Sequence, residues 1–171
     1  MLIDLDICSR HKMLQHTFEL DPDKWESIDS DVKEILKQNI SNWKTIKYFD
    51  DDGITLNNQI HELPNDSGGI YVFYLKPDLI PETHRYLMYI GRAQRKKTHS
   101  LYQRCRSYVS DTRPVISNLL KLWGNKLYLA YLPLQNDDVI KKVERELIKA
   151  IIPPCNSDIY DYDTLPAIPA F

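Results

Sequence analysis

The sequence predicts a mixed α/β (α+β) fold, in which a small three-stranded antiparallel sheet is flanked by helices and preceded by a partly helical extension. Two apolar runs, 69–76 and 85–92, are rich in β-branched and aromatic residues and flank a polar turn with two prolines, which predicts a β-hairpin. A third apolar run, 126–134, predicts another strand. Two helical segments precede this strand and one follows it, so the predicted order from residue 69 is ββααβα.

The N-terminal extension spans residues 1–67, and its first part, 1–20, is expected to form a short strand or loop. Apolar side chains recur at helical spacing from Ser30 to Ile46, which predicts a helix there with Ser30 as its N-cap. These apolar residues are Val32, Ile35, Leu36, Ile40 and Trp43. The sequences FDDDG and ELPNDSGG then predict turns that lead into the hairpin.

Three helices are predicted after the hairpin. The first is short, lies near Ser100–Val109, and follows a loop of sequence AQRKKTH. The second begins near Pro114 and ends at Gly124, since proline suits a first helical turn and glycine a helix end. The third is capped by Asn136, carries acidic residues in its first turn, and is stopped by two consecutive prolines.

The distribution of charge separates three regions of the chain. The formal net charge of −2 combines −7 in residues 1–67, +8 in residues 68–156 and −3 in an acidic tail, 157–171. A basic centre between acidic ends suggests a polyanionic partner for the middle region. The alternative is that the charged side chains are only unevenly distributed over solvated surfaces.

Several classes of protein are disfavoured by composition. The three cysteines are an odd number without a C-x-x-C pair, which argues against a disulfide framework and a zinc knuckle and favours a cytoplasmic location. No signal peptide is expected, because the first residues combine acids with apolar residues. No apolar run approaches the roughly 18 residues of a membrane span, so no membrane partner is expected. The five histidines are scattered without metal-ligand spacing.

Two helices carry unusual charged residues. On a helical projection of the last helix, Glu144 falls inside the apolar stripe, where a carboxylate needs a cation, a metal or strong donors. A structural ion pair with an arginine is the alternative. In the short helix, Arg104 and Tyr108 share one shoulder at i and i+4, and Arg106 projects near the opposite shoulder. A forked guanidinium suits a phosphate oxygen, although most such arginines simply face solvent.

Four sequence features occur in order between residues 68 and 156. They are Gly69-Ile70-Tyr71, Tyr89-Ile90-Gly91, the arginine helix SLYQRCRSY, and a pattern E-x4-K-x3-P-x2-N formed by Glu144, Lys149, Pro153 and Asn156. Together they resemble the GIY-YIG nuclease family. The two tyrosines are separated by residues 72–88, a longer interval than the compact form of the motif has. The stretch from Gly91 to Arg104 is also long. Arg92 stands where members of the family often have lysine.

The resemblance implies a DNA endonuclease that uses Mg²⁺ or Mn²⁺ and leaves 5′-phosphate and 3′-hydroxyl ends. Under this interpretation Glu144 binds the metal, Arg104 stabilises charge on the phosphate, and Tyr71 or Tyr89 activates water. A tyrosine can do so only if its pKa falls well below about 10. Tyr108 would position water or phosphate, and Asn156 would support the site.

The basic residues around this site are expected to contact the DNA backbone. They are Arg92, Arg95, Lys96, Lys97 and Arg106. The alternative from another class is a nucleic-acid-binding module that keeps the scaffold without cleaving. A small-molecule enzyme is disfavoured, since no glycine-rich phosphate loop or Ser/His/Asp arrangement is present. Restriction, repair, mobile-element and phage-defence roles all remain open.

Overall fold

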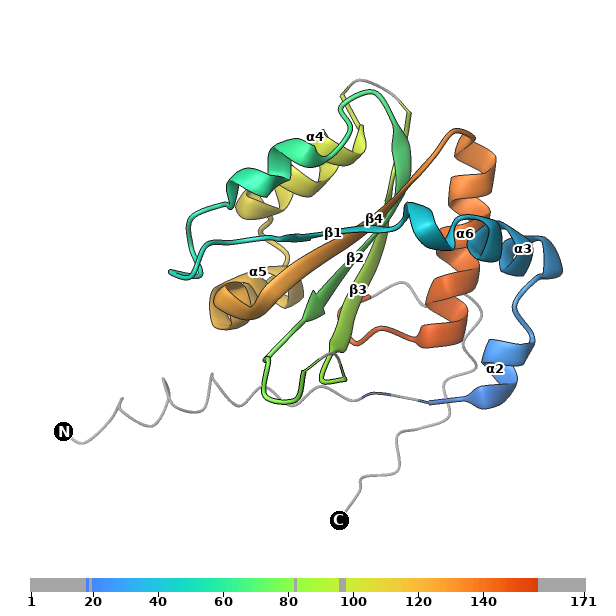
Figure 1. Cartoon of the computed structure of the whole chain (residues 1–171), viewed down its shortest axis with the longest axis horizontal. Helices are drawn as coiled ribbons and strands as arrows, with labels where there is room; N and C mark the ends of the chain where they lie inside the picture. The colour runs from blue at the N-terminus through green and yellow to red at the C-terminus, as the bar shows by residue number, and fades with distance from the viewer. Residues whose placement is uncertain (1–17, 19, 82, 96–97, 157–171) are drawn as a thin grey trace, which may run out of the picture.

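A computed structural model describes residues 18, 20–81, 83–95 and 98–156. It has a four-stranded antiparallel sheet with helices on both faces (Figure 1). In spatial order the strands are β1 (Lys44–Lys47), β4 (Leu127–Leu134), β2 (Gly68–Leu75) and β3 (Tyr86–Ala93). The mixed α/β class and the antiparallel sheet are confirmed, and the prediction of three strands is wrong.

The additional strand, β1, comes from the N-terminal extension. The helix predicted to reach Ile46 ends much earlier, because α3 spans Ser30–Gln38 and is followed by the short 3₁₀ helix η1 (Ile40–Asn42). The side chain of Asn39 donates to the Ile35 carbonyl oxygen at 2.9 Å, a local bond that competes with helix continuation. β1 then pairs along β4. The extension therefore contributes directly to the sheet.

Helix caps follow the expected chemistry with one correction. The N-cap of α3 is Asp29 rather than Ser30, and its carboxylate accepts from the backbone N–H groups of Asp31 and Val32. Asn136 caps α6 as predicted.

The remaining helices, by their bounds, are α2 (Pro22–Glu26), the 3₁₀ helix η2 (Asn58–Glu62), α4 (Leu101–Arg106), the 3₁₀ helix η3 (Ser107–Ser110), α5 (Pro114–Trp123), the 3₁₀ helix η4 (Gly124–Lys126) and α6 (Asp137–Ile151). The short helix predicted near Ser100–Val109 is therefore split into α4 and η3. Within the described part of the chain, no helix is long and apolar enough to cross a membrane.

The central strand β2 is buried on both faces of the sheet, and its side chains alternate between two cores. Tyr71 and Phe73 face the side covered by α4, η3 and α5. Ile70 and Val72 face the side covered by α6 and α3 (Figure 1). The same alternation in β3 turns Tyr89 toward the first side, beside Tyr71.

The two motif glycines allow this packing. Gly91 is the cross-strand partner of Tyr71, and a Cβ atom on Gly91 would lie 2.5 Å from both Cζ and the hydroxyl oxygen of that tyrosine. A Cβ atom on Gly69 would lie 2.2 Å from the carbonyl oxygen of Leu132 on the neighbouring strand β4. Gly91 therefore leaves the space that the Tyr71 ring occupies, and Gly69 permits close strand pairing.

Gly91→Ala is expected to destabilise the protein by about 1–3 kcal/mol, the usual cost of overpacking a buried site. Urea denaturation of four proteins tests this: the wild type, Gly91→Ala, Tyr71→Leu and the double variant. Because leucine lacks the outer part of the tyrosine ring, the cost of Gly91→Ala should be smaller in the Tyr71→Leu background. An equal cost in both backgrounds would show that the glycine serves another purpose.

Candidate functional site

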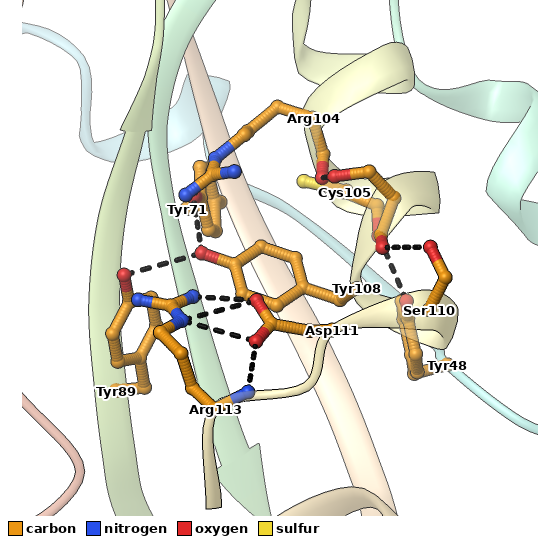
Figure 2. Close-up of polar contacts among 10 residues, drawn as sticks. Tyr48, Tyr71, Tyr89, Arg104, Cys105, Tyr108, Ser110, Asp111 and Arg113 are labelled. Carbon is orange, nitrogen blue, oxygen red and sulfur yellow. Dashed lines mark hydrogen bonds and ion pairs between the residues drawn. The ribbon is translucent and has the colours of Figure 1, made fainter. Parts of the chain in front are cut away.

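Three tyrosine hydroxyls form a hydrogen-bonded chain between β2, η3 and β3 (Figure 2). The hydroxyl oxygens of Tyr71 and Tyr108 lie 2.7 Å apart, and Tyr108 donates to Tyr89 over 3.1 Å. Because Tyr108 has one proton and gives it to Tyr89, Tyr71 must donate to Tyr108. Tyr71 and Tyr108 are fully buried, whereas Tyr89 is 8% exposed. Each buried hydroxyl thus has a partner, which avoids the cost of an unpaired polar group.

Two arginines flank this chain from different sides (Figure 2). Nε of Arg104 donates to the Tyr71 hydroxyl at 3.2 Å, and its guanidinium carbon lies 5.0 Å from the centre of the Tyr108 ring. The guanidinium of Arg113 lies 5.8 Å from the ring centre of Tyr89 and 5.7 Å from that of Tyr108. The tyrosine chain is therefore bordered by two permanent positive charges.

Burial sets the protonation of the inner tyrosines. It raises the pKa of Tyr71 well above the usual value, with further contributions from Tyr108 and Tyr89 that outweigh the opposing charge of Arg104. Burial also raises the pKa of Tyr108. Both side chains are therefore protonated at neutral pH. In this arrangement Tyr71 acts as a hydrogen-bond donor, since the lowered pKa required of a general base is not present there.

Glu144 on α6 forms an ion pair with Arg92 on β3. Nε of Arg92 lies 2.7 Å from Oε2 of Glu144, and the carboxylate side chain is 13% exposed. Burial raises the pKa of Glu144, while the charges of Arg92 and then Arg104 oppose that increase. The carboxylate thus has an arginine partner, one of the alternatives that the sequence left open. The charge of Arg104, which bonds to Tyr71, also lowers the pKa of this carboxylate.

Asn156 binds the backbone of β3, which is an edge strand. Its side-chain oxygen accepts from the Ile90 N–H at 2.9 Å, and its side-chain nitrogen donates to the Ile90 carbonyl at 2.8 Å. The backbone N–H of Cys155 donates to the Met88 carbonyl at 2.9 Å. Asn156 therefore holds the strand at the residue between Tyr89 and Gly91.

The residues predicted to contact the DNA backbone are placed differently from one another. Arg106 is exposed, with its guanidinium 5.9 Å from the ring centre of Tyr102. Arg95 is also exposed, and its backbone N–H donates to Asp137 at 3.0 Å. Lys96 and Lys97 lie outside the described residues, as do most of the segment 1–20 and the acidic tail. Arg92 is engaged by Glu144 as described above.

The sequence motifs did not point to three residues that shape this site. Arg113 and its partner Asp111 lie in the loop between η3 and α5, where nothing but their spacing marks them. Tyr48, from the extension, donates to the Cys105 carbonyl oxygen at 2.7 Å and so supports α4 (Figure 2). Recognising any of them requires knowing that η3 lies against the Tyr71 face of the sheet.

Glu144 offers one carboxylate, which is paired with Arg92, so a hard divalent cation here would have to be shared with a substrate. Among the residues that the structure describes, no three histidine, cysteine, aspartate or glutamate side chains gather in a metal-binding group. Mg²⁺ is commonly held by one or two carboxylates, with water and substrate phosphate oxygens completing the shell. A single, mostly buried carboxylate is compatible with that mode and not with an all-protein cage.

Comparison with protein-family profiles, with curated proteins and with solved structures finds no match to this chain. The interpretation of the site therefore depends on its own geometry and on the three sequence motifs that contact one another there, those of Tyr71, of Tyr89 and of the arginine helix.

Proposed function

We propose that this chain is a divalent-metal-dependent DNA endonuclease that produces 5′-phosphate and 3′-hydroxyl ends. The observation that carries this proposal is the convergence of separate motif residues on one hydrogen-bonded group. Tyr71, Tyr89, Arg104 and Tyr108 come from two strands and the arginine helix and its 3₁₀ extension, and they contact one another directly. The charge of Arg104 also acts on Glu144, so the last motif belongs to the same electrostatic environment.

In this proposal Arg104 binds the phosphate that is cleaved. Tyr71 accepts from Nε of Arg104, which fixes the direction of the guanidinium and leaves its terminal N–H groups for an anion. Preoriented donors aimed at developing charge are among the largest contributions to catalysis. The net charge of +8 over residues 68–156 favours approach of the polyanion.

Glu144 would hold Mg²⁺ or Mn²⁺ together with phosphate oxygens. Such an ion, when bound, neutralises the phosphodiester and stabilises the departing 3′ oxygen. Arg92 opposes the effect of burial on the pKa of Glu144 and so favours the ionised carboxylate, which metal binding requires. Asn156 maintains the edge strand that carries Tyr89 and Arg92.

Tyr89 is our candidate for the tyrosine that contacts the attacking water. It is the last hydroxyl of the chain and the only one of the three with any exposed surface. Tyr71 and Tyr108 are enclosed, so they orient Arg104 and Tyr89 and do not meet the substrate themselves. We also propose a cytoplasmic location, consistent with the buried free thiols of Cys105 and Cys155.

A non-catalytic nucleic-acid-binding module is the second candidate. It is favoured by the Arg92–Glu144 ion pair, because a structural ion pair also explains a carboxylate in that position. This candidate predicts DNA binding that is independent of Mg²⁺, with no cleavage.

Mg²⁺-dependent cleavage should require Glu144. Supercoiled, linear and branched DNA are incubated with the wild type and with Glu144→Gln, with Mg²⁺ or with EDTA, and the product ends are mapped. The variant should cleave at least ~10²–10³-fold more slowly, the scale of a lost catalytic interaction, while its affinity for DNA persists. Wild-type cleavage that survives EDTA would contradict the metal role, and binding without cleavage would favour the second candidate.

Arg104 and Arg106 form a matched pair for a second test, because they lie two residues apart on the same helix. Arg104→Ala should stop turnover, since of these two arginines Arg104 is the one that bonds to the tyrosine chain. Arg106→Ala should mainly weaken DNA affinity, because Arg106 is exposed. Single-turnover rates and equilibrium affinities of both variants separate these effects. Exchanged roles would show that the substrate approaches from the Arg106 side of the helix.

A further inference from the structure

Arg113 lies at the opposite end of the tyrosine chain from Arg104. It comes directly before α5, and its side chain is 47% exposed. Arg104 donates to Tyr71 at one end of the chain, whereas the Arg113 guanidinium lies over the rings of Tyr89 and Tyr108 at the other (Figure 2). The two guanidinium groups therefore bracket the hydroxyls.

Asp111 fixes the orientation of the Arg113 guanidinium. Nε of Arg113 lies 3.0 Å from Oδ1 and 3.1 Å from Oδ2 of the carboxylate, and Nη2 lies 2.7 Å from Oδ2. Oδ1 also accepts from the backbone N–H of Arg113 at 2.9 Å. This two-pronged pairing occupies one edge of the guanidinium, so Nη1 and the second Nη2 hydrogen are not used by Asp111.

The surroundings of Arg113 leave room for a substrate. Its guanidinium carbon lies 5.8 Å from the ring centre of Tyr89 and 5.7 Å from that of Tyr108. A hollow of about 330 Å³ adjoins it, lined mainly by Arg113, Val115, Ile116, Pro154 and Asn156. Asn156 in turn holds Ile90, the residue that follows Tyr89. An open space therefore adjoins an oriented guanidinium that lies beside Tyr89, the least buried of the three hydrogen-bonded tyrosines.

We propose that Arg113 is a second phosphate-binding residue of the nuclease site and that Asp111 is its positioning residue. The guanidinium contacts the same phosphodiester as Arg104, from the Tyr89 end. Guanidinium forks match phosphate oxygens, and the carboxylate holds this one in place before DNA binds. The inference rests on the proposed nuclease function. Its alternative is an exposed ion pair that only holds the loop, as many surface ion pairs do.

The first experiment measures DNA affinity across salt concentrations in EDTA, so that no metal-dependent cleavage occurs. Arg113→Ala should reduce the slope of log K against log salt by about 0.9, the value for one lost phosphate contact. Arg145→Ala is the matched control, since Arg145 is 50% exposed and also borders a carboxylate, that of Glu146. Its slope should equal that of the wild type. A loop-holding ion pair would leave the slope unchanged in both variants.

The second experiment measures single-turnover cleavage with Mg²⁺. Arg113→Ala should be ~10²–10³-fold slower than the wild type, as for other lost contacts to a reacting anion. Asp111→Asn should lower the cleavage rate when it is introduced into the wild type. It should not lower the rate further in the Arg113→Ala variant, because Asp111 acts through Arg113. If circular dichroism shows that Arg113→Ala does not fold, Arg113→Gln removes the same charge with a longer side chain and supplies both measurements.

The outcomes separate this inference from the nuclease proposal. A wild type that binds DNA without cleaving it overturns the nuclease proposal, while the salt slope still reports whether Arg113 contacts a phosphate. An unchanged slope overturns the phosphate contact, whatever the wild type cleaves. A shallower slope with a cleavage rate within about twofold of the wild type overturns the assignment to the cleaved phosphodiester.

Discussion

The need to satisfy the buried hydroxyl of Tyr71 is the constraint on which the rest of the site depends. An unpaired buried hydroxyl costs about 1–3 kcal/mol. The ring of Tyr71 fits because Gly91 has no side chain, and its hydroxyl is satisfied by Tyr108 and Arg104. Tyr108 follows α4, which the extension supports through the bond from Tyr48 to Cys105. The position and the hydrogen bonds of the Tyr71 hydroxyl therefore depend on strand pairing, on helix packing and on the extension.

The same burial divides the proposed chemistry between inner and outer groups. Tyr71 is protonated because burial raises its pKa, so in this structure it orients Arg104 as a neutral hydroxyl. Arg104 and Arg113 are partly exposed and carry permanent charges, which makes them the groups that can meet a phosphate. Burial raises the pKa of Glu144, and Arg92 and Arg104 oppose that increase, so the proposed metal would bind a carboxylate whose ionisation depends on nearby arginines.

Local periodicity predicts much of the fold, and non-local contacts account for the rest. The hairpin, the capped last helix and the shared shoulder of Arg104 and Tyr108 follow from spacing along the chain. Strand β1 does not, because a four-residue strand after an asparagine-rich segment depends on its pairing with β4, about 80 residues later. The pairing of Glu144 with Arg92 and the position of Arg113 are equally non-local. Each can be predicted only when the pairing of the strands is already known.

A crystal structure of the Glu144→Gln variant with uncleaved duplex DNA would show whether DNA occupies this site. We expect a phosphodiester in contact with both Arg104 and Arg113, on the side where Tyr89 ends the hydroxyl chain. We also expect Tyr71 and Tyr108 to remain bonded to each other beneath the DNA. Duplex bound to another surface, with Arg104 and Arg113 free of phosphate, would show that this cluster is not the site of cleavage.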